Sequence, residues 1–315
     1  MARTPPAAPL FTVLLPTHGR DEVIGHAIRS VLDQTVADFE LLIAGDGVAD
    51  RTRDVVASFA DPRIRWFDSP KGPGAGYVNR NRALAEARGR LVAFIAHDDI
   101  MLPDHLELLA APFRDERVGW GYSRPLWVDD HGTVVPFYVN LHDPVHRHAF
   151  MHERNSLPAT CVVYRRDEDD PAPWPEDAER LGDWILWKRL VGGLLERHGA
   201  RGIAHVRHPT CLHFRADWRR SDRWGPSPLM GMLRAREAAP ASWPNALSLF
   251  GGSEDEVASE GTVTPQHRVA ALMRADPNLS RRLRGGVTLL QDRLVWAMTQ
   301  ADDFALPPAS LAPED

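Results

Sequence analysis

Two adjacent acids, Asp98 and Asp99, follow the most apolar of the predicted strands, residues 91–96, with only His97 in between. Neighbouring carboxylates at the end of a buried strand repel each other and lose hydration, so the arrangement is costly unless a cation or ribose hydroxyls compensate. A hard divalent ion such as Mg²⁺ or Mn²⁺ takes one or two carboxylates together with substrate phosphates. The pair therefore indicates a metal and phosphate site, with a surface loop that caps the helix starting near Pro103 as the alternative.

A third acid, Asp46, follows another apolar run, residues 41–44, and is flanked by Gly45 and Gly47. These glycines allow a close approach of the backbone to a ligand. Because the carboxyl ends of parallel strands meet at one edge of a sheet, we expect Asp46 on the same edge as Asp98. The alternative is a turn residue, with Asp50 capping the next helix.

The glycine-rich segment 71–76, which begins with Lys71, lies between a predicted strand and a predicted helix that carries Arg80. It lacks the GK[ST] ending of a P-loop and the GxGxxG spacing of a dinucleotide-binding turn. Its position would still let backbone N–H groups and the Arg80 guanidinium face a diphosphate. A flexible surface loop is the alternative interpretation.

A histidine cluster has the i, i+4 spacing of metal ligands on a helix: His142 with His146, and His148 with His152. Pro144 interrupts the segment, and neither an HExxH pattern nor a nearby Cys accompanies it. We therefore expect a solvated or acceptor-facing loop rather than a zinc site.

The elements that must position these residues alternate between strands and helices up to about residue 125, a pattern typical of a parallel sheet with crossover helices. The predicted strands are 10–15, 39–44, 64–67 and 91–96, and the predicted helices are 24–32, 52–59 and 77–87. Further along we predict a hairpin at 127–138 turning at 130–132, strands at 160–164, 203–206 and 211–214, and helices at 183–195, 227–238, 264–275 and 286–300.

The composition favours a globular small-molecule enzyme. The 315 residues are 43% hydrophobic, enough for a substantial core, and the net charge of −6 with scattered arginines gives no footprint for nucleic acid or an anionic membrane. No stretch approaches the roughly 20 apolar residues of a membrane span, and residues 1–9 lack a signal-peptide core, so we expect a cytoplasmic protein. Cys161 and Cys211 lie in apolar runs and are expected to be buried thiols.

Several segments, taken in order, resemble the family 2 glycosyltransferases of the GT-A fold, including the SpsA-like members, over roughly residues 10–215. Residues 11–20 resemble the family's opening strand and its PTYNR-type turn, residues 30–43 its SVLxQTxxDFELI stretch, and residues 44–52 its DDGSxDxT segment. Arg80 and Asn81 match the family's ARN position, and Gly89 matches its ARG position. Residues 94–106 resemble the FxDxDDxxxPDxL stretch, and residues 183–190 resemble the EDWDLWLRL helix. The sequence departs from these patterns at Gly45 and Val48, which replace an Asp and a Ser, at Ala96 and His97, and at Gly182, which replaces Glu.

The resemblance implies a donor site, a metal site and a general base. The residues are Pro16, Thr17, Arg20, Asp46, Arg80 and Asp98 for the donor, Asp99 and His213 for the metal, and Asp183 for the base. Thr17 and Asp46 would hold the nucleobase and ribose of the donor. Arg80 would contact the donor's nucleobase or its phosphates, and Asp98 would contact the ribose. Asp183 by itself, at the start of an amphipathic helix, suggests only a cap.

The implied fold is α/β of the GT-A type, a mostly parallel central sheet with flanking helices and a C-terminal helical extension. We expect an N-terminal tail at 1–9, a nucleotide-sugar-binding half at 10–125, an acceptor-binding half at 126–222 and the helical extension at 223–315. The extension would form either a lid or the face of a homodimer.

The implied activity is that of an inverting hexosyltransferase dependent on Mn²⁺ or Mg²⁺. The donor would be a UDP-, dTDP- or GDP-linked sugar, and the acceptor a hydroxyl of a saccharide or of a glycosylated small molecule. One alternative is a catalytically silent nucleotide- or sugar-binding subunit, suggested by Gly45. Another is a sugar nucleotidyltransferase, although that class would place a GxGxR loop where this chain has Pro16-Thr17-His18-Gly19.

Overall fold

A computed structural model describes residues 8–128, 134–135, 139–153, 155–167, 169, 173–214 and 265–276. The chain divides into two compact units, one formed by Met1–Arg124 with Val139–Cys211 and the other by Pro125–Tyr138 with Leu212–Asp315. Every candidate residue named above except His213 belongs to the first unit. Within the described ranges, no helix is long and apolar enough to cross a membrane.

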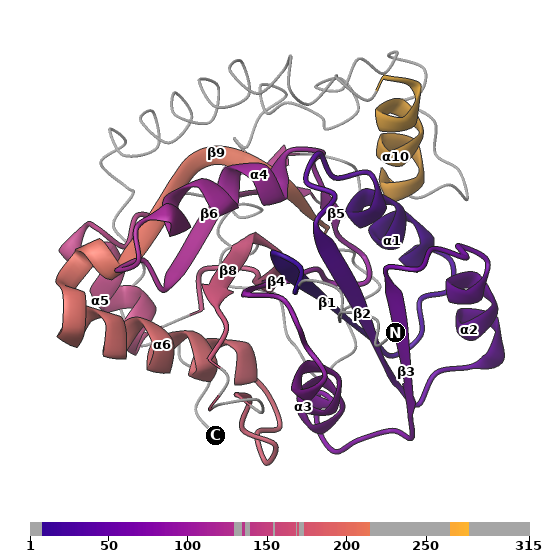
Figure 1. Cartoon of the computed structure of the whole chain (residues 1–315), viewed down its shortest axis with the longest axis horizontal. Helices are drawn as coiled ribbons and strands as arrows, with labels where there is room; N and C mark the ends of the chain where they lie inside the picture. The colour runs from indigo at the N-terminus through magenta and orange to yellow at the C-terminus, as the bar shows by residue number, and fades with distance from the viewer. Residues whose placement is uncertain are drawn as a thin grey trace, which may run out of the picture. The chain divides into compact units, whose positions relative to one another are not determined.

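The first unit is built on a mixed sheet with helices packed against it (Figure 1). Its elements, some of which run on into the second unit, are β1 (Phe11–Thr17), α1 (Ile24–Leu32), β2 (Phe39–Asp46), α2 (Asp50–Ala57), β3 (Ile64–Ser69), α3 (Tyr77–Ala85), β4 (Leu91–Phe94), β5 (Ile100–Met101), α4 (His105–Ala110), β6 (Trp120–Val128), α5 (Pro144–His152), β8 (Val162–Arg165), α6 (Gly182–His198) and β9 (Ile203–Phe214). Short 3₁₀ segments lie at Ala111–Arg114, Ala159–Cys161 and Gly199–Gly202.

The strand order is β3-β2-β1-β4-β8-β6-β9-β5. The pairs β3–β2, β2–β1 and β1–β4 are parallel, and β8 then pairs antiparallel with both β4 and β6. The predicted α/β class with helices flanking the sheet is therefore confirmed, and the parallel half comes from the predicted βαβ crossovers. The division into functional halves stays a prediction.

Each face of the sheet carries its own apolar core because strand residues alternate between the faces. Val13 and Leu41 pack with α1, α2 and α4, whereas Leu14 and Leu42 pack with α3, α5 and α6. The spacing of the apolar residues in α1 predicts one buried face, and the helix buries four of its five residues, Ile24, Ala27, Ile28 and Val31, while the fifth, Leu32, is half-buried. The strands are thus held from both sides, which fixes where their ends lie.

The structure corrects two local predictions, and each correction involves a proline. Pro144 does not interrupt a helix but begins α5, where its missing N–H costs nothing, and Asp143 accepts hydrogen bonds from the N–H groups of Val145 (2.8 Å) and His146 (3.3 Å). The strands predicted at 203–206 and 211–214 are one continuous strand, β9, despite Pro209. A proline removes only one donor, and pairing resumes at once with the Leu102 N–H on the Thr210 carbonyl.

In the second unit, β7 (Val134–Val135) pairs antiparallel with the end of β6, as the predicted hairpin requires. The predicted turn at 130–132 lies outside the described residues. Helix α10 (Pro265–Ala275) agrees with the helix predicted at 264–275. The helices predicted at 227–238 and 286–300 also fall outside the described residues, so they stay predictions.

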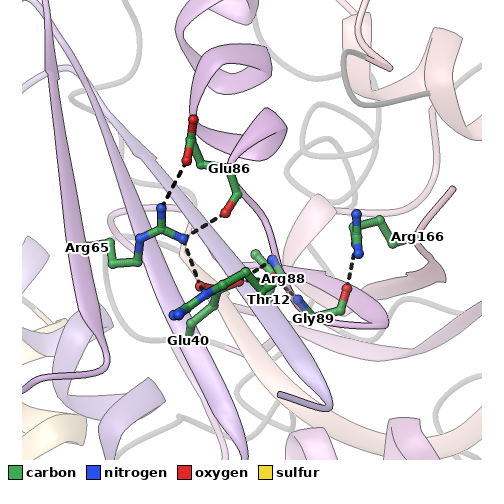
Figure 2. A network of polar contacts seen from close by, with 7 residues as sticks. All are labelled: Thr12, Glu40, Arg65, Glu86, Arg88, Gly89 and Arg166. Carbon is green, nitrogen blue, oxygen red and sulfur yellow. Dashed lines mark hydrogen bonds and ion pairs between the residues drawn. The ribbon is translucent and has the colours of Figure 1, made fainter. Parts of the chain in front are cut away.

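A polar network centred on buried Glu40 fixes the connection between α3 and β4 (Figure 2). Its carboxylate accepts hydrogen bonds from the Thr12 hydroxyl (2.8 Å), from the N–H and guanidinium of Arg88 (2.6 and 2.8 Å) and from Arg65 (3.0 Å). The Thr12 hydroxyl in turn accepts from the Gly89 N–H. A Cβ at Gly89 would stand 2.2 Å from the Thr12 nitrogen, so only glycine fits there. The network therefore sets the entry into β4, the strand that leads to Asp98.

We expect Glu40→Gln to lower the free energy of unfolding at pH 7 by about 2 kcal/mol, because charge-assisted hydrogen bonds from partly exposed guanidiniums are lost. Burial alone would raise the pKa of Glu40, but the hydrogen bonds from Arg88, Thr12 and Arg65 together hold this pKa below its usual 4.5. The stabilisation is thus present above pH 4.5 and is lost as the pH falls below it. Urea unfolding of both proteins between pH 7 and pH 4 should show the difference shrinking. A constant difference would contradict this assignment.

Candidate functional site

The carboxyl ends of β1, β2 and β4 meet at one edge of the sheet. Thr17 lies opposite Gly45 in the β1–β2 register, and Leu14 lies opposite Phe94 in the β1–β4 register. Asp46 therefore ends β2 beside Thr17, and β4 leads into Asp98 and Asp99 at the same edge. This placement was predicted from the apolar runs alone and is confirmed.

Asp46 is buried and anchors the glycine-rich segment 71–76. Its carboxylate pairs with Lys71 Nζ (2.8 Å) and accepts hydrogen bonds from the Gly72 N–H (2.6 Å) and the Asn79 amide (2.7 Å). Gly76 has φ +73°, and a Cβ there would stand 2.5 Å from an Asp46 oxygen. Burial would raise the pKa of Asp46, but these donors, Lys71 first, lower it overall.

The Asp46 contacts change the interpretation of segment 71–76. The Gly72 N–H and the Lys71 ammonium, which could face a diphosphate, bind the Asp46 carboxylate in this structure. Asn79 and Lys71 were not predicted as site residues. The only signal for them was the position of the glycine-rich segment directly after β3, which does not specify a partner. The donor-binding role of Asp46 stays a prediction.

The turn after β1 is tied to the end of β2. The Thr17 hydroxyl donates to the Gly19 carbonyl (2.6 Å), and His18 Nδ1 donates to the backbone carbonyl of Asp46. Pro16 lies opposite Ala44 in the register, and Arg20 has φ +73°, an uncommon conformation for a residue other than glycine. The predicted donor-site residues Pro16 and Thr17 therefore end β1 beside the end of β2, and Arg20 lies in the turn that follows.

Asp98 and Asp99 are each only 1% exposed. The Thr160 hydroxyl, itself buried, donates to Asp99 Oδ2 and accepts from the Ala96 N–H (3.1 Å). His97 Nε2 lies 3.8 Å from Asp98 Oδ2. Thr160, which comes from the segment before β8, was missed because nothing in the spacing of the sequence links it to Asp99.

The oxygen donors of Asp98 and Asp99 fit a hard divalent cation whose remaining ligands are substrate phosphates and water. In the part of the chain that the structure describes, no group of three or more His, Cys, Asp or Glu side chains could hold a metal ion. A site completed by a diphosphate needs no such group. His213 belongs to the second unit, so its predicted contribution to the metal site of the first unit stays a prediction.

Asp183, near the start of α6, is held by two donors. Arg80 Nη1 lies 2.9 Å from Asp183 Oδ1, and the Trp174 indole N–H donates to the same oxygen at 2.8 Å. Among the described residues, no hydrogen bond to this carboxylate reaches Oδ2. Asp183 can therefore present one oxygen to a ligand while the other is fixed.

The predicted histidine cluster lies on and beside α5. His146 Nδ1 accepts a hydrogen bond from the Asn140 N–H (3.2 Å), and the rings of His148 and His152 lie with their centroids 4.7 Å apart, tilted by 42°. The expectation that this cluster is not a zinc site stays a prediction.

A protein-family model and several curated proteins match the sequence of this chain. The family model described as "Glycosyl transferase family 2" matches residues 12–168. The Escherichia coli protein named UDP-Glc:alpha-D-GlcNAc-diphosphoundecaprenol beta-1,3-glucosyltransferase WfgD is 32% identical over 128 residues, which are 41% of this chain and 50% of the relative. The putative teichuronic acid biosynthesis glycosyltransferase TuaG of Bacillus subtilis is 38% identical over 101 residues, which are 31% of this chain and 40% of the relative. The match thus spans half or less of these curated relatives.

Solved structures with a similar course of the chain include S. aureus TarS 1–349 in complex with UDP-GlcNAc. Its TM-score is 0.49 at 19% identity, covering 65% of this chain and 58% of that chain. Glucosyl-3-phosphoglycerate synthase from Mycobacterium tuberculosis, in complex with Mn²⁺, UDP and phosphoglyceric acid, gives a TM-score of 0.42 at 19% identity, covering 62% of this chain and 68% of that chain.

Proposed function

Because the chain belongs to glycosyl transferase family 2 and has the GT-A fold, we propose that it transfers a sugar from a nucleotide diphosphate donor to a hydroxyl acceptor, with inversion at the anomeric carbon. The observation that carries the proposal is the meeting of Thr17, Asp46 and the Asp98-Asp99 pair at one edge of the sheet. Ligands of open α/β sheets bind at this edge. The donor is a UDP-, dTDP- or GDP-linked sugar, and the UDP-Glc in the name of the E. coli relative favours UDP.

The roles of the residues follow from their chemistry. Thr17 and Asp46 would contact the nucleoside, and Asp98 the ribose. Asp99 would hold Mn²⁺ or Mg²⁺, which would supply positive charge to stabilise the leaving diphosphate. Asp183 would take the proton of the acceptor hydroxyl on Oδ2 as that oxygen attacks the anomeric carbon.

The acceptor in this proposal is a saccharide or a glycosylated small molecule. The E. coli relative is named for a sugar acceptor carried on diphosphoundecaprenol, which supports a saccharide hydroxyl as the attacking group. A catalytically silent nucleotide- or sugar-binding subunit is the second candidate, favoured by the departure at Gly45.

A panel of nucleotide sugars incubated with Mn²⁺ separates these candidates. We expect slow hydrolysis or transfer that releases the nucleoside diphosphate from at least one donor. A protein that binds UDP by calorimetry yet releases no nucleotide from any donor would be the silent subunit, and the proposal of transfer would be wrong.

We expect Thr160→Val to weaken Mn²⁺ affinity in the presence of UDP by roughly 10- to 100-fold, because Asp99 loses the hydroxyl that orients it. Thr160→Ser keeps the hydroxyl and should bind nearly as the wild type does. Electron paramagnetic resonance titration of Mn²⁺ measures this without turnover.

Thr52→Val is the matched control for Thr160→Val. Thr52 is also fully buried, and its hydroxyl has no hydrogen-bond partner among the described residues. Equal Mn²⁺ affinity in Thr160→Val and Thr52→Val would show that Thr160 does not orient a metal ligand.

A further inference from the structure

We propose that Tyr77 and Arg80 of α3, together with Trp174, are positioning residues that hold Asp183 for proton abstraction. This inference rests on the proposed function, since it concerns the base of that reaction. Arg80 is thereby assigned to the general base, Asp183, whereas the resemblance to the family predicted a contact between Arg80 and the nucleotide donor. The contacts of Gly182, of Arg80 and of Trp174 carry the argument.

Tyr77 fills the space that a side chain at position 182 would need. A Cβ on Gly182 would stand 2.4 Å from Tyr77 Cζ and 2.7 Å from each Cε, distances that no real Cβ shows. The Glu that the family pattern has at this position therefore cannot coexist with Tyr77 as it is placed here. The departure at Gly182 and the tyrosine at position 77 form one paired feature of this chain.

The Tyr77 hydroxyl also caps α6. The first N–H groups of a helix have no partner within it, and the residue that precedes α6, Leu181, makes no side-chain cap. The Tyr77 oxygen accepts a hydrogen bond from the Gly182 N–H at 2.8 Å. Helix α3 thereby fixes the turn of α6 on which Asp183 stands.

The Asp183 side chain is fixed from the same side. Arg80 and the Trp174 indole N–H both bind Oδ1, and the Arg80 guanidinium lies over the Tyr77 ring (4.8 Å) and near the Trp174 ring (5.9 Å). The Arg80 side chain is only 17% exposed. A guanidinium held between two rings and a carboxylate is pre-organised for that carboxylate, and Oδ2 is left to receive a proton.

Tyr77 adds no charge beside the base. Burial first, and then the Asp183 carboxylate, raise the pKa of Tyr77 above 10.0, so the phenol stays neutral. The surroundings of Asp183 thus combine one cation with neutral hydrogen-bonding groups.

The test separates base positioning from donor binding through Tyr77→Phe, Arg80→Met and Trp174→Phe. We expect each to lower kcat by roughly 10- to 100-fold, because a misplaced reacting group costs up to about 10²-fold, while the Kd of UDP with Mn²⁺ stays within about 3-fold of wild type. Arg80→Lys keeps a cation near Oδ1 and should recover part of the lost kcat. Calorimetry gives Kd, and nucleotide release under saturating donor gives kcat.

Trp184→Phe is the matched control, because the Trp184 indole N–H donates to the Phe150 carbonyl (2.6 Å) and not to Asp183. It should keep near wild-type kcat. Thermal unfolding of each variant checks that it folds, and Trp174→Phe and Tyr77→Phe retain an aromatic ring so that packing survives.

The outcomes are distinct. If Arg80→Met weakens UDP affinity as much as it lowers turnover, Arg80 binds the donor and the positioning proposal is wrong. If wild type turns over and all three variants keep its kcat, the proposal is equally wrong while the proposed function stands. If wild type binds UDP without releasing nucleotide from any donor, the proposed function fails, and the positioning role fails with it.

Discussion

Asp183→Asn is expected to lower kcat by about 10²–10⁴-fold while leaving the affinity for UDP and Mn²⁺ nearly unchanged. An amide has the shape of the carboxylate and can still accept hydrogen bonds from Arg80 and Trp174, but it cannot take the acceptor proton. Donor binding uses other residues, so it should survive. Nucleotide release at saturating donor and acceptor gives kcat, and calorimetry gives the Kd.

Asp177→Asn is the control for Asp183→Asn, because Asp177 is an exposed acid in the segment that leads to α6. It should behave as the wild type does. Near wild-type turnover of Asp183→Asn would remove Asp183 from the reaction, whatever its contacts with Arg80. A loss of UDP affinity equal to the loss of kcat would instead make Asp183 a donor-site residue.

Asp99→Asn is expected to abolish the stimulation of nucleotide binding by Mn²⁺. Asp99 is buried beside Asp98, so the amide removes a negative charge from the place where the cation would bind. The amide oxygen can still accept the Thr160 hydrogen bond, so the end of β4 should keep its conformation. Titrating UDP by calorimetry with and without Mn²⁺ measures the effect.

The wild type must show a clear gain in UDP affinity with Mn²⁺ for Asp99 to hold a metal, and Asp115→Asn should show the same gain. Asp115 is an acid on the surface that pairs with Arg117 at 2.7 Å. If Asp99→Asn keeps the full gain, the cation binds elsewhere. If the wild type shows no gain, the transfer does not depend on a metal.

The two variants together resolve the reaction into parts. Asp183→Asn should change turnover and not donor binding, whereas Asp99→Asn should change metal-assisted donor binding first. If both variants bind UDP and Mn²⁺ and turn over as the wild type does, the reaction takes place at another site.

The amino-acid pattern by itself determined the strands and the edge at which they end. Short apolar runs separated by helical spacing predict parallel strands with crossovers, and parallel strands place the residues that follow them at a common edge. The sequence alone therefore suffices to place Asp46 and the Asp98-Asp99 pair at that edge. The resemblance to the family then singled out Asp183, whose position in the sequence is otherwise that of a simple helix cap.

Only the tertiary structure decided what holds these acids. Thr160 lies 61 positions from Asp99, Asn79 33 positions from Asp46, and Arg80 103 positions from Asp183. Hydrophobic periodicity reports which face of one element is buried, but it carries no information about which polar side chain of a distant element arrives there. The exclusion of any side chain at position 182 by Tyr77, 105 positions earlier, depends on how closely α3 and α6 pack, and packing at that scale exists only in the folded chain.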